Sequence, residues 1–255
     1  MLVEDDLLSC ELTELLDGVD LVFHQAGQPC VRLSWADGFD THVRLNVLAT
    51  QRLLEAAKRP SLKRFVYTSS SSVYGAAELC LTDEGHVPTP MSPFGVAKLA
   101  AEHLCSLYHR NFGVPTVPLR YCTVYGPRQR PDITINRLSN PALTGSEFTM
   151  FGDGSQIRDF TYVDDVVATN LAATLTEGAA GDVINIGGGS AATMQEVVAA
   201  VAVASNSPRN MTYTDKVSGD VFRTGVDIPR AAEALGWEPK TGANPFSLTG
   251  LGYAA

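Results

Sequence analysis

A row of hydroxyl side chains and a lysine are the residues of this sequence that could do chemistry together. The hydroxyls occupy positions 68–72 (T-S-S-S-S), and Lys98 follows in the segment S-P-F-G-V-A-K. Hydroxyls can orient a substrate oxygen, and a lysine can lower the pKa of a neighbouring phenol by placing positive charge beside it. A redox site with a tyrosine base would need that phenol four residues before Lys98. The sequence has Phe94 there, and a phenyl ring cannot donate, accept or ionise.

Two further segments suit a ligand. Residues 24–29 (H-Q-A-G-Q-P) contain Ala26 and Gly27, which are small enough for a cofactor to approach the backbone. Residues 121–132 (Y-C-T-V-Y-G-P-R-Q-R-P-D) offer Arg128 and Arg130 to anionic groups. Taken singly, each segment has an ordinary structural explanation, because serine runs often serve turns and arginines are usually solvated. Their coincidence at successive strand ends points to a site.

These segments must be positioned by an alternation of strands and helices. Apolar runs rich in β-branched residues predict strands at 19–24, 64–69 and 114–121, and apolar periodicity predicts helices at 43–58 and 94–111. Such alternation is typical of an α/β fold with a doubly wound parallel sheet. Ligands of open α/β sheets bind outside the carboxyl ends of the strands, so the three segments would meet there.

The second half of the chain predicts a smaller lobe above the sheet edge. From residue 128 onward it becomes richer in Pro, Gly and Asn, and its elements are shorter. We predict helices at 133–143, 163–175 and 193–204, a turn at 152–154 and a strand at 183–186. We therefore divide the chain into residues 1–127 and 128–255, with some segments of the second part returning to the sheet.

One segment of the second half resembles a phosphate-binding loop. Residues 184–193 (I-N-I-G-G-G-S-A-A-T) follow a strand, open a helix and fit the pattern G-x-G-x-x-A. However, no acidic residue lies about 20 residues further on to bind a ribose, and the next strand is weak. We interpret the segment as a turn at a helix start.

Composition and charge exclude several classes of partner. The chain has 255 residues, 45% of them hydrophobic, and a formal net charge of −9, which disfavours phosphate backbones and anionic lipid. No apolar run approaches the roughly 18 residues of a membrane span, and Glu4, Asp5 and Asp6 do not suit a signal peptide. Five cysteines without a C-x-x-C pair and five histidines without ligand spacing predict no metal site. We therefore expect a cytoplasmic protein that binds neither nucleic acid nor membrane.

A series of motifs runs along the chain from about residue 3 to residue 241. They are D-L-V-F-H-Q-A (20–26), N-V-L-A-T-Q-R-L-L-E-A-A (46–57), T-S-S-S-S-V-Y-G (68–75), S-P-F-G-V-A-K (92–98), L-R-Y-C-T-V-Y-G-P-R-Q-R-P-D (119–132), F-G-D-G-S-Q-I-R-D-F-T-Y-V-D-D-V (151–166), N-I-G-G-G (185–189) and G-D-V-F-R-T-G-V-D-I-P-R-A-A-E-A-L-G-W-E-P-K-T (219–241). In this order they resemble the NAD-dependent epimerase/dehydratase family of extended short-chain dehydrogenases/reductases, above all its UDP-glucuronate and UDP-glucose 4-epimerases. The resemblance implies a Rossmann-like NAD-binding domain followed by a lobe that binds a nucleotide sugar.

The resemblance also implies a mechanism. In the family, hydride passes to and from NAD while a tyrosine takes the proton of the sugar C4 hydroxyl, through a 4-keto intermediate. Lys98 matches the lysine that holds the nicotinamide ribose, and Ser70 matches the hydroxyl of the proton path, with Ser71 and Ser72 beside it. The tyrosine falls on Phe94. Because a positioned acid or base contributes ~10²–10⁴-fold in rate, we expect little epimerisation.

The cofactor site departs from the family as well. Family members begin with a strand, a G-x-x-G-x-x-G loop and a helix that bind the NAD pyrophosphate, whereas Met1–Leu7 already resembles the end of the third strand. We therefore expect the first β-α-β unit to be absent, the sheet to present raw edges, and NAD binding to be weak or missing. The remaining cofactor contacts would be Asp6 near the adenine, Ala26 and Gly27, and Lys98.

Substrate contacts are implied by other positions. Arg158 matches the arginine that binds the nucleotide diphosphate, and Asp220 matches the residue that contacts the nucleotide ribose. Many relatives have an arginine where this chain has Val217. Thr123 and Arg130 match residues that help hold the sugar carboxylate in UDP-glucuronate 4-epimerases. A UDP-uronate is therefore the leading substrate.

Two alternatives to an active 4-epimerase stay open. One is a degenerate pseudoenzyme that binds a nucleotide sugar or a partner subunit. The other is a 4,6-dehydratase or 4-ketoreductase, although a dehydratase would carry Asp and Glu where this chain has Ser71 and Ser72. The resemblance further implies a homodimer formed through the helices at 43–58 and 94–111.

Overall fold

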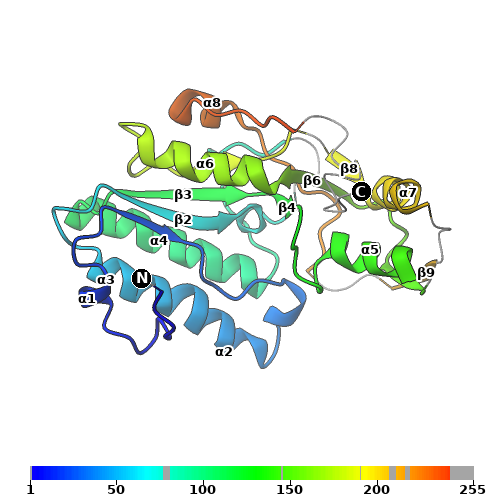
Figure 1. Cartoon of the computed structure of the whole chain (residues 1–255), viewed down its shortest axis with the longest axis horizontal. Coiled ribbons are helices and arrows are strands. Elements are labelled where there is room, and N and C mark those ends of the chain that lie inside the picture. The colour runs from blue at the N-terminus through cyan, green and yellow to red at the C-terminus, as the bar shows by residue number, and fades with distance from the viewer. Residues whose placement is uncertain are drawn as a thin grey trace.

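A four-stranded parallel sheet in the order β1-β2-β3-β7 forms the centre of the protein. The structure is a computed structural model, and it describes residues 2–76, 81–144, 146–189, 191–206, 211–215 and 219–241. The strands are β1 (Leu21–His24), β2 (Arg64–Ser70), β3 (Thr116–Tyr121) and β7 (Ile184–Ile186). Helices cover both faces of this sheet (Figure 1), so the predicted doubly wound α/β fold is confirmed.

Each face of the sheet has its own apolar core. The helices α3 (Ala49–Ala56) and α4 (Pro93–Phe112) cover one face, with the short α1 (Leu12–Leu15) beside α3. The helices α6 (Val163–Leu175) and α8 (Pro229–Leu235) cover the other. The first core includes Leu54, Phe65 and Cys105, and the second includes Leu119 and Ile184. Burial of these side chains is what fixes the sheet between its helices.

The helix predicted at 43–58 begins earlier and changes its winding. It runs without interruption through α2 (Gly38–His42), the π-helical η2 (Val43–Leu48) and α3. A 3-10 turn, η1 (Arg32–Ser34), precedes it. A Cβ atom on Gly38 would lie 1.8 Å from the Leu33 carbonyl oxygen, so only glycine allows the chain to enter the helix here. Apolar periodicity does not report such a contact.

The other predicted elements shift by a few residues at their ends. Helix α4 begins at Pro93, because the Ser92 hydroxyl caps it by accepting a hydrogen bond from the Gly95 N–H at 3.1 Å. It ends at Phe112 and is capped by Gly113, whose φ of +70° suits glycine. Strands β1 and β3 each begin two residues later than the predicted 19 and 114.

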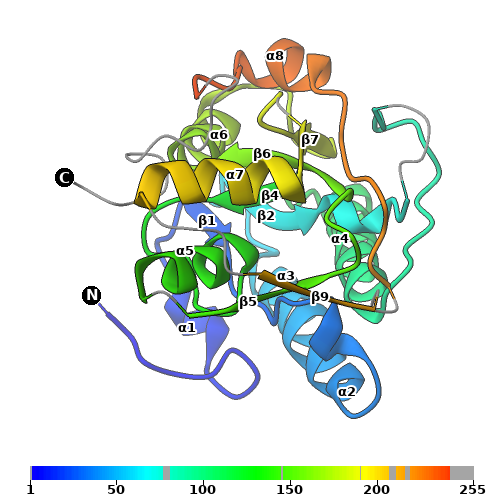
Figure 2. The same ribbon diagram turned by 90° about the vertical axis from the view of Figure 1, so that its right-hand side faces the viewer.

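The smaller lobe consists of short strands and two helices. The strands β4 (Thr123–Tyr125), β6 (Ile157–Tyr162) and β8 (Ala191–Thr193) form one sheet, and β5 (Phe148–Phe151) pairs with β9 (Met211–Thr214). The helices are α5 (Thr134–Thr144) and α7 (Met194–Ser205). Figure 2 shows α5, α7 and the β5–β9 pair grouped at one end of the molecule. Because β7, α6 and α8 pack with the central sheet, the division at residues 127 and 128 stays a prediction.

The glycine segment of the second half is a packing turn. A Cβ atom on Gly188 would lie 1.8 Å from the Phe160 carbonyl oxygen, so the turn packs directly on β6. Strand β8 separates it from α7, whose N-terminus is closed by a reciprocal capping box between Thr193 and Glu196. Because β8 lies between the glycines and α7, our interpretation of the segment as a turn at a helix start is wrong. The glycines do not open a helix, so the segment lacks the geometry of a phosphate loop as well.

The beginning of the described chain differs from the prediction. Residues 2–6 form no strand, although Met1–Leu7 resembles a strand end. Within the described residues β1 pairs only with β2, and Leu21 and Phe23 on it are 39% and 40% exposed. No helix in these ranges is long and apolar enough to cross a membrane. The same residues contain no cluster of three or more side chains that could hold a metal ion.

Candidate active site

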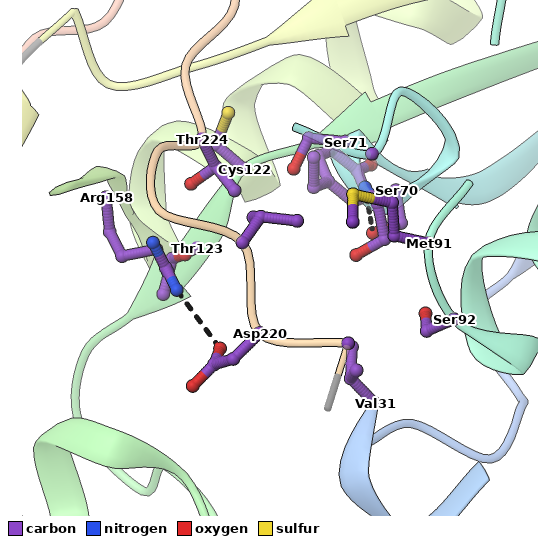
Figure 3. Close-up of a pocket in the computed structure, with 15 residues that line it drawn as sticks. Val31, Ser70, Ser71, Met91, Ser92, Cys122, Thr123, Arg158, Asp220 and Thr224 are labelled. Atoms are coloured by element: carbon purple, nitrogen blue, oxygen red, sulfur yellow. Dashed lines mark hydrogen bonds and ion pairs between the residues drawn. The ribbon is translucent and has the colours of Figure 1, made fainter. Parts of the chain in front are cut away.

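Four adjoining cavities lie along the carboxyl ends of the sheet strands. The first, the serine cavity, has a volume of about 220 Å³ and is lined by Ser70, Ser71 and Ser72 from the end of β2. Figure 3 shows Arg158 and Asp220 of the smaller lobe on one side of this space and Met91 and Ser92 on the other. The predicted meeting of strand-end residues thus occurs.

The second cavity, the lysine cavity, has a volume of about 530 Å³ and is lined by Lys98, Phe94, Gly27 and Arg130. It shares Ser70, Tyr121, Cys122 and Thr123 with the serine cavity. Hydroxyl groups at the end of β2 therefore face both spaces. The two cavities therefore adjoin at these residues.

The outer two cavities extend this row in both directions. The arginine cavity, of about 120 Å³, is lined by Arg32, Arg137, Arg158 and Asp220 and adjoins the serine cavity. The acidic cavity, of about 470 Å³, is lined by residues 4–7, Ala26, Gly27, Leu45 and Ala49, and it adjoins the lysine cavity through Gly27. Asp6 and Ala26 thus lie together, as the sequence predicts.

Phe94 occupies the predicted position beside Lys98. It is the second residue of α4 and is 9% exposed. Its ring meets the buried His42 ring edge to face, with 6.2 Å between centroids and 87° between planes. The ring closes one side of the lysine cavity without offering a proton acceptor.

Burial raises the pKa of two nearby tyrosines. Tyr121 lines both the serine and lysine cavities, but burial raises the pKa of its phenol. Burial also raises the pKa of Tyr74, whose hydroxyl donates to Asn185 Oδ1 at 2.8 Å. Both phenols therefore stay protonated near neutral pH.

Lys98 is a buried amine with one hydrogen-bond acceptor nearby. Its Nζ donates to the Thr68 carbonyl oxygen at 2.8 Å, and the residue is 7% exposed. It takes part in none of the ion pairs found among the described residues. Burial lowers the pKa of Lys98 from 10.5 to about 8. The amine therefore carries most of a positive charge at neutral pH and holds it at the cavity wall.

The serine row is held by its own turn. Ser70 precedes the 3-10 turn η3 (Ser71–Val73) and accepts a hydrogen bond from the Ser72 N–H at 3.2 Å. This cap directs the chain away from the sheet, so that the three serines line the cavity.

A buried polar network beneath the serine row was not found by sequence reasoning. Glu102 on α4 accepts hydrogen bonds from Ser69 Oγ at 2.8 Å and from Arg120 Nε at 2.9 Å. Arg120 also donates to the Tyr74 hydroxyl, and this hydroxyl donates to Asn185 on β7. The network joins α4, β2, β3 and β7 immediately below the cavities. Its residues lie far apart in the sequence, and nothing in their spacing signals the contact.

Two hydrogen bonds hold the loop after β1 in place. Asn46 binds Gln28 twice, accepting from its N–H at 2.8 Å and donating to its carbonyl oxygen at 3.0 Å. A Cβ atom on Gly27 would lie 2.5 Å from Asn46 Oδ1, so a larger residue would displace the Asn46 amide from Gln28. Burial and the charge of Lys98 lower the pKa of His24 to about 4, so its ring is neutral.

The residues present fit two parts of NAD. Lys98 and Gly27 line a space that suits a nicotinamide ribose, and Asp6 lines one that suits an adenosine. These residues would hold the two ends of the cofactor, which would supply the hydride acceptor and donor.

The predicted substrate residues are distributed over two cavities. Arg158 NH2 donates to Asp220 Oδ1 at 3.1 Å at the edge of the serine cavity (Figure 3). Arg130 pairs with Asp132 at 2.9 and 2.6 Å and lines the lysine cavity with Thr123. Val217 lies outside the described residues. Arg32 and Arg137 were missed, because arginines in a loop and on a helix are usually solvated.

Comparison with known proteins agrees with this geometry. Residues 2–187 match the model of the NAD dependent epimerase/dehydratase family. The chain is 41% identical to an uncharacterized UDP-glucose epimerase, YtcB, of Bacillus subtilis (strain 168), over 94% of this chain and 75% of that protein. It is 33% identical to the UDP-glucuronate 4-epimerase of Thermodesulfobacterium geofontis (strain OPF15), over 87% of this chain and 68% of that protein.

A solved structure is similar over nearly the whole described chain. It is a tyrosine-to-phenylalanine mutant of UDP-glucuronic acid 4-epimerase from Bacillus cereus, in complex with UDP-4-deoxy-4-fluoro-glucuronic acid and NAD. The TM-score is 0.94 and the identity 40%, with 98% of this chain and 80% of that chain covered. That protein therefore forms such a complex although one of its tyrosines is replaced by phenylalanine.

Proposed function

The chain belongs to the NAD dependent epimerase/dehydratase family. We propose that it descends from 4-epimerases and binds a UDP-sugar. We also propose that it converts this ligand to its 4-epimer only slowly. The observation that carries this proposal is the composition of the serine cavity. Three serines and Thr123 line the same space as Arg158 and Asp220. Hydroxyls suit a sugar, and a guanidinium fork suits phosphate oxygens.

A uronate is the sugar that these residues favour. Its carboxylate would find hydroxyl donors at Ser71, Ser72 and Thr123, with the guanidinium of Arg130 near the adjoining cavity. The relatives from Thermodesulfobacterium geofontis and Bacillus cereus are UDP-glucuronate epimerases, which supports this choice.

The weak step in this proposal is proton transfer. In the family, NAD supplies the hydride acceptor and donor. In this chain Ser70 would orient the sugar hydroxyl, and Lys98 would hold positive charge beside it. Phe94 cannot take the proton, so the rate is expected to be lower by ~10²–10⁴-fold than with a positioned base.

Calorimetry and NMR test the proposal together. We expect UDP-glucuronate to bind more tightly than UDP-glucose, with little 4-epimer formed over hours even with added NAD. Stoichiometric NAD in the purified protein would overturn the expectation of weak NAD binding, and 4-epimer formation at ordinary enzyme rates would overturn the low activity. Failure to bind either sugar nucleotide would overturn the function itself.

The second candidate is a protein that only binds. Phe94 favours it, because binding needs no base at that position. Complete absence of 4-epimer, together with tight UDP-glucuronate binding, would select it. A dehydratase is less favoured, because Ser71 and Ser72 supply no carboxyl group to the cavity.

Homodimer formation through two helices is a further part of the proposal. Leu48 on η2 and Val96 and Leu107 on α4 are 45%, 48% and 51% exposed. Helices η2 and α4 pack against each other, so these side chains belong to neighbouring surfaces. Burial of exposed leucine and valine between two copies would favour association.

A further inference from the structure

One segment near the end of the described chain forms a wall of the serine cavity. This segment, the strap, consists of residues 219–227, and Figure 3 shows Asp220 and Thr224 on it. On one side it pairs with β6, where the Thr224 N–H donates to the Ile157 carbonyl oxygen at 3.1 Å. On the other side the Asp227 N–H donates to the Thr82 carbonyl oxygen at 3.0 Å. The shape of the cavity therefore depends on where the strap lies.

A buried carboxyl group lies next to the strap. Asp159 on β6 is 3% exposed, and its Oδ1 accepts a hydrogen bond from the Gly188 N–H at 3.0 Å. The Val226 N–H of the strap and the Cys122 thiol also donate to this carboxyl group. A Cβ atom on Gly187 would lie 2.7 Å from Asp159 Oδ2 and 2.9 Å from Val226 Cγ2, so the packing here is close. One side chain thus joins the loop after β7, the residue after β3 and the strap.

All three groups that contact this carboxyl group are hydrogen-bond donors. A charged carboxylate can accept from each of them, whereas a protonated one turns one of its oxygens into a donor. Because the Gly188 N–H holds Oδ1, we expect the proton on Oδ2, where it competes with the donors of Val226 and Cys122. Protonation therefore weakens the hold on the strap, and the charged form strengthens it.

Stability of the fold does not explain a charge at this position. Burial raises the pKa of Asp159 from 3.8 to about 6, so the folded protein binds this proton more tightly than the unfolded chain. The free energy of unfolding therefore falls as the pH rises from 3.8 through 6. The charged carboxylate that is present at neutral pH makes the fold less stable than a neutral group would.

The other charged groups nearby do not neutralise Asp159. The titratable residues on the segments packed against it are Cys122, Arg158 on β6, and Arg223 and Asp227 on the strap. Arg158 pairs with Asp220 instead, and no ion pair found among the described residues includes Asp159. The carboxylate is thus held by hydrogen bonds alone.

We propose that charged Asp159 is a positioning residue that holds the strap as a wall of the serine cavity, so that binding of the nucleotide sugar depends on pH. This inference rests on the proposed function, because the ligand of the cavity is the UDP-sugar. The ligand binds the protein with the strap in place, and the affinity therefore falls as Asp159 takes up a proton.

Binding of UDP-glucuronate to Asp159→Asn at pH 7.5 and pH 5 tests the proposal. The carboxylate and the diphosphate of this ligand stay charged at both pH values, so the ligand itself does not titrate. At pH 7.5 we expect the variant to bind about 3- to 10-fold more weakly than the parent chain, because one hydrogen bond that holds the strap is lost. The parent chain should weaken by a similar factor between pH 7.5 and pH 5, whereas the variant should change little. At pH 7.5 the variant should melt at the same temperature as the parent chain or at a higher one.

Asp165→Asn is the matched control. Asp165 on α6 is also buried, at 4% exposure, and accepts hydrogen bonds from the Lys240 and Thr241 N–H groups at 3.0 Å each. It lines none of the four cavities. This variant should therefore keep the affinity for UDP-glucuronate and its pH dependence. Hydrogen exchange at pH 7.5 adds a readout without ligand, since the strap amides should exchange faster in Asp159→Asn than in the parent chain.

Each remaining outcome has a defined meaning. If Asp159→Asn binds UDP-glucuronate like the parent chain, or keeps its strap amides as protected, the inference is wrong while the proposed function stands. An equal loss of affinity in Asp165→Asn would also overturn the inference, because any buried carboxylate would then have the same effect. If Asp159→Asn does not fold, the parent chain decides, and an affinity that is equal at pH 7.5 and pH 5 overturns the inference. If the parent chain binds no UDP-glucuronate, the proposed function fails and the inference fails with it.

Discussion

At the scale of single residues, a buried amine and a phenyl ring occupy the positions where proton transfer is expected. The serine row, Phe94 and Lys98 could be predicted, because a strand end and a helix start place them at fixed spacing. Arg32 could not be predicted, because its partner Asp220 is 188 positions away. Loop residues show no periodicity that would indicate such a contact.

Lys98→Met should stabilise the ligand-free protein near neutral pH. The folded-state pKa of about 8 lies below the ordinary 10.5, so the unfolded chain binds this proton more tightly. The wild-type free energy of unfolding should therefore rise between about pH 8 and pH 10.5. Below pH 8, the buried charge lowers this free energy by at most ~3 kcal/mol. Methionine has a similar length and no charge, so the variant lacks this pH dependence.

Urea unfolding at pH 7 and pH 10 measures this effect. The advantage of Lys98→Met should be largest at pH 7 and should shrink at pH 10. Lys63→Met provides the control, because Lys63 is exposed and paired only with Asp20 at the surface. An equal advantage at both pH values would contradict the interpretation.

At the scale of helices and strands, the ion pair between Arg120 and Glu102 holds α4 onto β2 and β3. Arg120→Met leaves the Glu102 carboxylate buried, with only the Ser69 hydroxyl still bound to it. We expect a loss of about 3–5 kcal/mol in the free energy of unfolding, which removal of one partner of a buried pair typically costs. The double variant Glu102→Leu with Arg120→Met should lose less, because no charge stays buried.

Urea unfolding of these variants measures the energetic coupling between Arg120 and Glu102. Arg230→Met is the control, because it breaks the surface ion pair between Arg230 and Asp182. The side chains of these two residues are 43% and 39% exposed. Its effect should be within about 1 kcal/mol. If Arg120→Met behaved like this control, the network would have no role in fixing the strand ends.

Element types could be predicted better than element ends. Alternating apolar runs were enough to place the four strands of the central sheet and α4, because burial of apolar side chains determines both the strands and the helix. The start of the helix at Gly38 depends on one close contact with the Leu33 carbonyl, and the π-helical η2 packs against α4, a segment distant in sequence. Neither contact leaves a periodic signal.

At the scale of the whole molecule, the proposed dimer depends on apolar side chains that the single chain leaves exposed. Leu107→Asp should shift the protein toward monomer, because a carboxylate would be buried at the proposed interface. Sedimentation velocity at several concentrations measures the shift. Leu175→Asp, at the exposed end of α6, should leave the oligomeric state unchanged. A wild-type monomer at high concentration would contradict the dimer.

The sheet order also governs how the chain folds as it is synthesised. Strand β3 ends at Tyr121, but its outer neighbour β7 begins only at Ile184. While the ribosome makes the intervening segment, the nascent chain carries β3 with one edge unpaired. Contacts between distant segments form late, and unpaired strand edges associate with other chains. We therefore expect slower translation between these two strands to lengthen the time during which the newborn protein can misassemble.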